Sequence, residues 1–128
     1  MYSVVSLFAG IGGICLGFKQ AGFDVIWANE KDHSACLTYR HNFGSNYLVE
    51  GDIRNISEGC IPHADILAAG FPCQSFSAAG AGRGFSDPRG TLFFEVIRVA
   101  KAIQPRVIFL ENVENLIEHD NGRTFQTI

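Results

Sequence analysis

Short apolar runs alternate with helix-forming segments along the whole chain, and this alternation constrains the fold more than any other feature. Period and turn residues predict strands at positions 2–8, 25–28, 47–49, 66–69 and 107–110. Helices are predicted at 14–21, at 33–42 after a cap by Asp32, and at 91–103. Strands separated by helices are typical of a parallel sheet with right-handed crossovers. We therefore predict a Rossmann-like α/β fold with strand order 3-2-1-4-5.

Composition limits the class of protein. A chain of 128 residues with 47% apolar residues is long enough for one domain with a buried core. No apolar run approaches the roughly 18 residues that a membrane span needs, and no basic segment followed by a cleavable apolar one begins the chain. We therefore expect a cytoplasmic location and no membrane partner. The net charge is -3 and the basic residues are scattered, so charge alone predicts no nucleic-acid partner.

The four cysteines form no C-x-x-C pair and are expected to remain thiols in a cytosolic chain. A zinc site could draw on His33 and Cys36 together with Cys60 and His63, but nothing in the sequence brings the two pairs together. Small buried thiols and surface histidines are the favoured interpretation, and no metal site is predicted.

A glycine turn, FAGIGG at positions 8–13, follows the first predicted strand and opens a helix. Such a turn lets the backbone close on a ligand at the helix amino terminus. Its spacing differs from the dinucleotide fingerprint, but Glu30 lies about twenty residues beyond Gly10, where an acid can bind ribose hydroxyls. An adenosine-containing cofactor fits this pattern, and a purely structural turn is the alternative.

Cys73 and Glu111 follow the fourth and fifth predicted strands. In the order 3-2-1-4-5 these strands are neighbours, so the two side chains would share a cleft with the glycine turn at the carboxyl edge of the sheet. Alone, Cys73 could be an inert buried thiol and Glu111 a solvated strand end. Their joint placement favours a nucleophile and an acid in one site.

Four segments resemble the motifs of the cytosine-C5 DNA methyltransferases, in the family's order and spacing. They are FAGIGG at 8–13, GFPCQSFS at 70–77, DPRGTLF at 87–93 and ENV at 111–113. The chain is similar to the amino-terminal part of that catalytic domain over essentially its whole length. The later strands, the target-recognition domain and the closing cofactor motif of the family are absent from residues 1–128.

The resemblance implies S-adenosylmethionine as methyl donor. The residues expected to hold it are Phe8, Gly10, Gly12, Glu30, Asp52, Ile53, Pro72 and Leu92. Phe8 would stack on the adenine, Gly10 and Gly12 would lie near the methionine moiety, and Glu30 would bind the ribose.

The same resemblance implies a covalent mechanism on cytosine. Cys73 would attack C6 as a thiolate, and Glu111 would carry the proton or hydrogen bond that relieves charge at N3. The target base would be flipped out of double-stranded DNA, with the glycine-rich segment 78–90 as a lid. The remaining substrate-binding residues implied are Phe71, Gln74, Ser77, Asn112 and Val113.

Two alternatives stay open: the same chemistry on transfer RNA, and a nonenzymatic S-adenosylmethionine-binding remnant that dimerises. A last helix beginning near Gly122, capped by Asp120 or Asn121, has less than two turns before Ile128. Because so short a helix is marginal in water, we expect further protein to pack on it. That partner would be a complementing carboxyl-terminal chain or a second copy.

Overall fold

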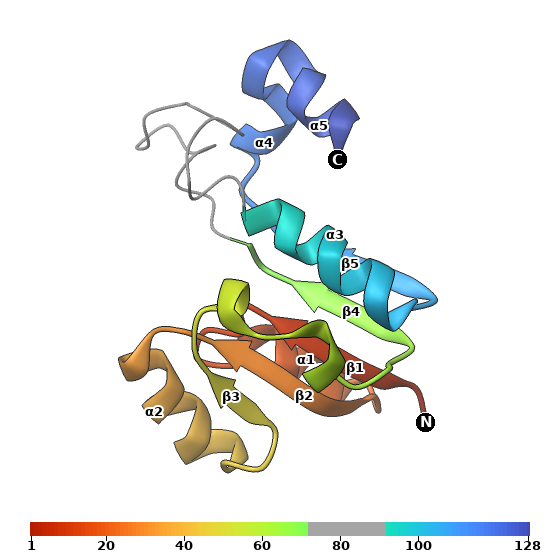
Figure 1. The fold of residues 1–128 in the computed structure, drawn as a ribbon. Coiled ribbons are helices and arrows are strands. Elements are labelled where there is room, and N and C mark those ends of the chain that lie inside the picture. The colour runs from red at the N-terminus through yellow and green to blue at the C-terminus, as the bar shows by residue number, and fades with distance from the viewer. Residues whose placement is uncertain (72–91) are drawn as a thin grey trace.

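The computed structural model describes residues 1–71 and 92–128, which form one parallel sheet with helices on both faces (Figure 1). The strand order is β3-β2-β1-β4-β5, as predicted, and every pairing is parallel. The strands are β1 (Ser3–Leu7), β2 (Asp24–Glu30), β3 (Leu48–Glu50), β4 (Ile66–Ala69) and β5 (Val107–Leu110). The Rossmann-like fold class is therefore confirmed.

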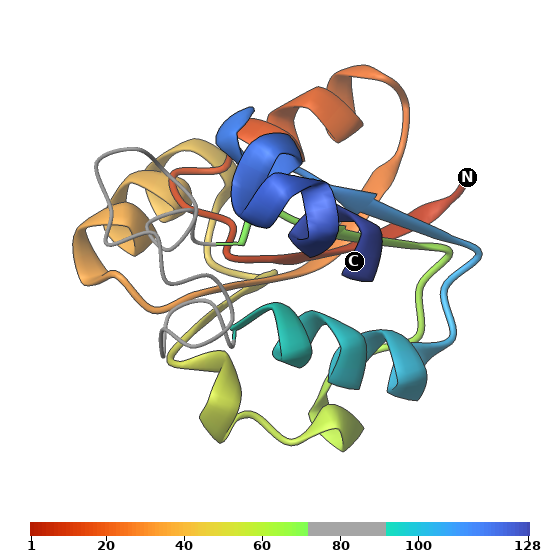
Figure 2. The same ribbon diagram turned by 90° about the horizontal axis from the view of Figure 1, so that it is seen from above.

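The helices divide between the two faces of the sheet, as Figure 2 shows. On one face lie α1 (Gly13–Gln20) and α2 (His33–Phe43). On the other lie α3 (Leu92–Ile103) and the short 3-10 turns η1 (Ile53–Asn55) and η2 (Glu58–Cys60). The chain ends in α4 (Asn115–Glu118), the 3-10 turn η4 (His119–Gly122) and α5 (Arg123–Thr127).

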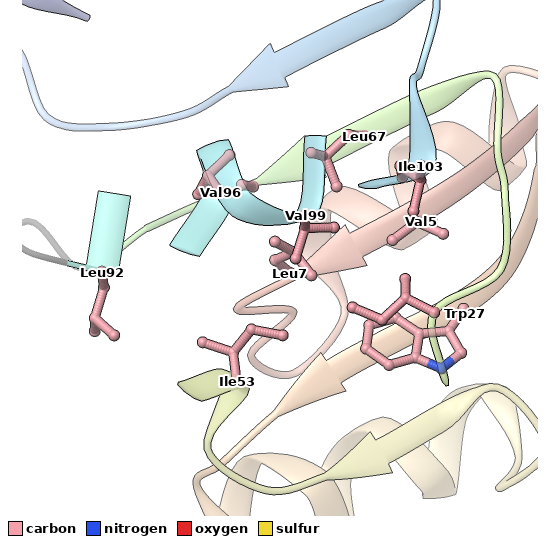
Figure 3. Packing of buried hydrophobic residues seen from close by; sticks show 11 residues of the cluster. Val5, Leu7, Trp27, Ile53, Leu67, Leu92, Val96, Val99 and Ile103 are labelled. Carbon is pink, nitrogen blue, oxygen red and sulfur yellow. The ribbon is translucent and has the colours of Figure 1, made fainter. Parts of the chain in front are cut away.

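Successive side chains of the central strands point to opposite faces of the sheet and so contribute to two separate cores. In β4, Leu67 and Ala69 face α3, whereas Ile66 and Ala68 face the side covered by α1 and α2. The apolar side of α3 packs Val96, Val99 and Ile103 onto the first of these faces (Figure 3). Because both faces of β1 and β4 are covered, β4 is a continuous apolar run and β1 is rich in Val and Leu, which explains why the sequence identified them.

The residue predicted to cap α2 is the one that caps it in the structure. The Asp32 side chain accepts a hydrogen bond from the Ala35 backbone N–H at 2.7 Å, which caps the first turn. The helix ends at Gly44, whose φ of 80° is favourable only for glycine.

The prediction of a side-chain cap for the last helix was wrong. The N-cap of α5 is Gly122, with no side-chain cap, and Asp120 and Asn121 have φ of 52° and 54°. Both residues lie inside η4, and Gly122, with a φ of 82°, takes the N-cap position, where it has no side chain that could accept a hydrogen bond. The Asp120 carboxylate instead accepts from Arg123 at 2.7 Å. The turns α4, η4, η1 and η2 were not predicted, because elements of three or four residues show no period.

The outer edge of the sheet at β5 is open to solvent. Its residues Val107, Ile108, Phe109 and Leu110 are 53%, 46%, 44% and 37% exposed. Within the described part of the chain, β5 pairs only with β4. None of the helices described is long and apolar enough to cross a membrane.

Candidate active site

A cavity of about 270 Å³ opens at the carboxyl edge of the sheet, where loops from all five strands meet. Its volume is close to the lower end of the ~300–1,000 Å³ typical of ligand pockets. It is lined by Phe8, Asn29, Glu30, Lys31, Gly51, Asp52, Ile53, Gly70, Phe71, Leu92, Glu111, Asn112 and Val113. The position is where ligands bind in open α/β sheets.

Most of the predicted site residues that the structure describes line this cavity. They are Phe8, Glu30, Asp52, Ile53 and Leu92 from the cofactor set, with Glu111, Phe71, Asn112 and Val113. Gly10 and Gly12 are not among the lining residues. Pro72, Cys73, Gln74, Ser77 and the segment 78–90 lie outside the described residues, so the roles predicted for them stay predictions.

The glycine turn has left-handed backbone at Phe8, Gly10 and Gly12, with φ of 54°, 57° and 100°. Phe8 is not a glycine, so its conformation is a strained one held by its surroundings. Gly12 caps α1, and a Cβ there would lie 2.2 Å from Cε2 of Phe43. Gly12 therefore serves the close packing of the turn against α2.

Glu30 anchors the turn. Its Oε2 accepts from the Gly10 backbone N–H at 2.8 Å, and its Oε1 accepts from the N–H groups of Lys31 and Asp32 at 2.7 and 2.8 Å. A carboxylate has about four acceptor positions, so one on Oε2 remains for a ligand hydroxyl. The side chain thus links three loop N–H groups and can still bind a ribose.

Asp52 and Ile53 bring the segment after β3 into the cavity wall. The Asp52 carboxylate accepts from the Arg54 backbone N–H at 3.0 Å and pairs with the Arg54 guanidinium at 2.5 Å. Hydrogen bonding to Arg54 lowers the pKa of Asp52 to about 2, so the carboxylate is ionised and paired with the Arg54 cation. Ile53 is 2% exposed and packs into the core below α3, which fixes the position of the loop.

Glu111 lies at the end of β5, and its backbone N–H donates to the Ala69 carbonyl at 3.0 Å. Its carboxylate lies over Gly70, because a Cβ built on Gly70 would be 3.2 Å from Oε2 of Glu111. Asn112 donates from Nδ2 to the Phe71 carbonyl at 3.2 Å. These contacts hold the end of β5 against the residues that lead to Pro72 and Cys73.

The cavity also contains residues that the sequence analysis missed, namely Asn29, Lys31, Gly51 and Gly70. Asn29 is 1% exposed in β2, a strand that also contains Asp24 and Glu30, so one more polar residue there gave no separate signal. Lys31 follows Glu30 directly and contributes a positive charge to the wall of the cavity. Gly51 and Gly70 contribute close-lying backbone, which no side-chain pattern reveals.

The residues weighed for zinc lie on different faces of the sheet. His33 and Cys36 are on α2, whereas Cys60 ends η2 on the other face. The Cys36 thiol donates to the Glu30 carbonyl, and His33 pairs with Glu50. In residues 1–71 and 92–128 no three His, Cys, Asp or Glu side chains are grouped as metal ligands.

The chain is similar in sequence to known proteins over its whole length. The chain is 55% identical to the type II methyltransferase M.Bsp6I of Bacillus sp. (strain RFL6), covering 100% of this chain and 41% of that protein. It is 46% identical to M.HhaI of Haemophilus parahaemolyticus, covering 97% of this chain and 37% of the relative. The chain thus spans about two fifths of the length of these relatives.

Solved structures share the fold. A putative DNA modification methyltransferase from an E. coli prophage matches with a TM-score of 0.80 and 30% identity, over 99% of this chain and 36% of that one. The S. pombe Dnmt2 methyltransferase matches with a TM-score of 0.74 and 22% identity, over 99% and 41% of the two chains. The model of the C-5 cytosine-specific DNA methylase family matches residues 2–128. The chain therefore belongs to the family of C-5 cytosine-specific DNA methylases.

Proposed function

We propose that residues 1–128 are the amino-terminal part of the catalytic domain of a type II DNA methyltransferase that methylates C5 of cytosine. The observation that carries the proposal is that the residues predicted to bind the cofactor line one cavity together with Glu111. The relatives in the comparison are type II methyltransferases, which supports DNA over transfer RNA as the substrate. Recognition of the target sequence would lie outside these residues.

The described residues fit S-adenosylmethionine. Phe8 offers an aromatic face for the adenine, Asp52 and Ile53 flank it, and the remaining acceptor position of Glu30 suits a ribose hydroxyl. Leu92 and Ile53 supply apolar surface to the same cavity. When bound, the cofactor supplies the electrophilic methyl group.

The chain's own residues carry the chemistry on the base. The Cys73 thiolate attacks C6 and forms a carbon–sulfur bond, and the displaced electron density moves onto the ring, where C5 becomes nucleophilic. Glu111 relieves the charge by hydrogen bonding or proton transfer at N3. After methyl transfer a base removes the C5 proton, and the thiolate leaves as the ring double bond reforms. The stacked cytosine must first be flipped out of the duplex.

The test uses the complete methyltransferase, with duplex DNA that contains 5-fluorocytosine and with labelled S-adenosylmethionine. Fluorine at C5 cannot be removed as a proton, so a covalent enzyme–DNA complex should accumulate. Cys73→Ser should abolish both the complex and methylation, while the affinity for the cofactor stays within roughly threefold because the thiol contacts the base. Normal turnover by Cys73→Ser would overturn the mechanism.

Other outcomes of the same assay separate the alternatives. Methylation of transfer RNA without methylation of DNA would establish the RNA substrate. Cofactor binding with no adduct on either nucleic acid would establish a nonenzymatic binding module. The cofactor affinity is measured in the same preparation, so a protein that has lost its fold is recognised.

We also propose that the open β5 edge packs against the carboxyl-terminal part of the methyltransferase, in the same chain or a complementing one. Next to the edge lies an apolar groove of about 530 Å³ to which Tyr2, Phe18, Phe23, Val107 and Phe109 contribute. Exposed apolar patches of this kind mark interfaces. The relatives, of which this chain spans about two fifths, contain a longer polypeptide that could cover it.

Substitutions at the two sheet edges test this contact. Ile108→Glu places a charge on β5 and should abolish copurification of residues 1–128 with the coexpressed carboxyl-terminal part. Val49→Glu makes the same change at the opposite edge strand β3, where Val49 is 38% exposed, and should leave copurification unchanged. Equal recovery of both variants would contradict the proposed interface. Loss of both would point to unfolding, which circular dichroism reports.

A further inference from the structure

Asn29 is a buried amide at the centre of the loops that form the cofactor wall. It is 1% exposed, precedes Glu30 at the end of β2, and lines the cavity. Its Nδ2 donates to two backbone carbonyls, those of Val49 and Gly51, each at 2.9 Å. Both N–H groups of the amide are therefore used.

The backbone of the same residue joins the opposite loop. The Asn29 carbonyl accepts from the Ala9 N–H at 2.9 Å, at the start of the glycine turn. Asn29 thus connects the turn that carries Phe8 and Gly10 with the segment that follows β3. Phe8 of the first segment and Gly51, Asp52 and Ile53 of the second line the same cavity.

The segment after β3 depends on this amide for its shape. Gly51 has a φ of 153°, and its N–H donates to the Glu30 carbonyl at 2.9 Å. Directly after it, Asp52 and Ile53 reach the cavity. The carbonyls of Val49 and Gly51 lie on either side of a bend in the chain, and each needs a hydrogen-bond donor. The Asn29 amide supplies both donors.

We propose that Asn29 is a positioning residue for the adenosine end of the methyl donor, because it sets the loop that carries Asp52 and Ile53. This inference rests on the proposed function. Asn29 acts through the loop and through Glu30, and it has no part in bond making at the base. Its loss should therefore raise KM and Kd for S-adenosylmethionine and spare kcat at saturating cofactor.

The central variant is Asn29→Asp in the complete methyltransferase. The side chain keeps its size, but an ionised carboxylate faces two carbonyl oxygens and cannot donate to either. At about pH 8 the affinity for S-adenosylmethionine should fall roughly tenfold or more. Burial against carbonyl oxygens raises the pKa of a carboxyl group, so acidification should restore one O–H donor and part of the affinity by about pH 5.5.

The pH profile separates positioning from general damage. Glu30, Lys31, Glu50 and Asp52 surround the loop and are present in both proteins, so the difference between the variant and wild-type profiles belongs to position 29. Asn42→Asp makes the same chemical change at an exposed position of α2 and should follow the wild-type profile. Circular dichroism at each pH checks that the variants are folded.

If Asn29→Asp does not fold, Asn29→Ser keeps one neutral donor and should weaken cofactor binding several-fold, again with kcat within roughly threefold of wild type. Wild-type affinity in the folded Asn29→Asp and Asn29→Ser variants, or equal loss of kcat and affinity with no pH dependence, would overturn the inference. Absence of binding by the wild-type enzyme would instead overturn the proposed function, so the two failures are distinguishable.

Discussion

At the scale of single residues, backbone conformation and close approach decide which positions tolerate change. Gly12 combines a φ of 100° with contact against the Phe43 ring, whereas Gly17 lies exposed in the middle of α1 with nothing within 4 Å of an added Cβ. One glycine caps α1 and the other lies within it, and their constraints are opposite.

We therefore expect Gly12→Ala to lower the free energy of unfolding by about 1–3 kcal/mol, through strain and displacement of the Phe43 ring. Gly17→Ala should leave it unchanged or raise it by about 0.5–1 kcal/mol, because alanine is the better helix former. Urea unfolding of the two variants measures both. Equal changes in the free energy of unfolding for the two variants would show that the left-handed backbone at Gly12 does not restrict which residue can stand there.

Gly70 lies between a core side chain and the carboxylate of Glu111, so a change at Gly70 affects both. A Cβ there would meet Oε2 of Glu111 and Cδ1 of Ile14, each at 3.2 Å, so Gly70→Ala must move one of them by a few tenths of an ångström. With Glu111 in its proposed catalytic role, we expect kcat for methylation by the complete enzyme to fall roughly tenfold, since small misplacements of catalytic groups are costly. The affinity for S-adenosylmethionine should change little. Unaltered kcat would mean that Ile14 alone moves.

The sequence predicted the residues of the site better than their contacts. Phe8, Glu30 and Glu111 lie in one cavity because they follow β1, β2 and β5 at the carboxyl edge of one parallel sheet. Asn29 was missed because it directly follows the predicted strand 25–28, and a polar residue at a strand end looks the same in the sequence whether it faces solvent or holds a loop. Gly12 was expected near the cofactor, and only the fold reveals its packing against Phe43.

At the scale of elements, strands and long helices followed from period and turn residues, whereas short turns depend on side-chain bonds. β4 has the predicted bounds because four apolar residues between turn signals are too few for a helix and are typical of a short strand. The Asp52 cap of η1 is set by its partner Arg54, two residues along. Such a local pairing is recognised only when both side chains are placed.

Removing Arg54 should change the titration of Asp52. The pKa of Asp52 lies at about 2, below its ordinary value of 3.8, so the stabilisation is complete above pH ~4 and is lost as pH falls towards 2. In Arg54→Leu the pKa should return towards 3.8 and this acid-range stability should disappear. Carboxyl-carbon NMR titration measures the shift. Arg123→Leu, which removes a different aspartate pair, should leave Asp52 unchanged.

The core contact of α3 is a second prediction at this scale. Val99 is fully buried between the helix and the sheet. Val99→Ala should lower the free energy of unfolding by about 1.5–3 kcal/mol, through lost burial and the cavity left behind. Lys101→Ala, at an exposed position of the same helix, should change it by less than about 0.5 kcal/mol. Chemical denaturation compares them.

At the scale of the whole molecule, the two edges of the sheet differ. β3 ends at Glu50, which is paired with Arg40 and His33, so charge protects that edge. β5 presents four exposed apolar residues and none with a charge. Nothing in the local sequence of β5 distinguishes it from a covered strand such as β4, so the exposure could be seen only in the assembled fold.

Residues 1–128 expressed alone should therefore self-associate at micromolar concentration, because an uncovered apolar edge strand pairs with other chains. Sedimentation velocity should show oligomers, and Ile108→Glu should shift the population towards monomer. Val49→Glu should not. A wild-type chain that sediments as a monomer across this range would refute the expectation.

The position of β1 in the middle of the sheet has a consequence for synthesis. Ser3 hydrogen bonds to Asp65, 62 residues later, and β1 pairs with β4 along the same boundary. While the protein emerges from the ribosome, β1 and β2 can meet early, but the other side of β1 has no partner until β4 has left the exit tunnel. The nascent chain thus carries an unpaired edge of β1 through about half of this region's translation. During that interval a chaperone that covers the edge would prevent it from pairing with other chains.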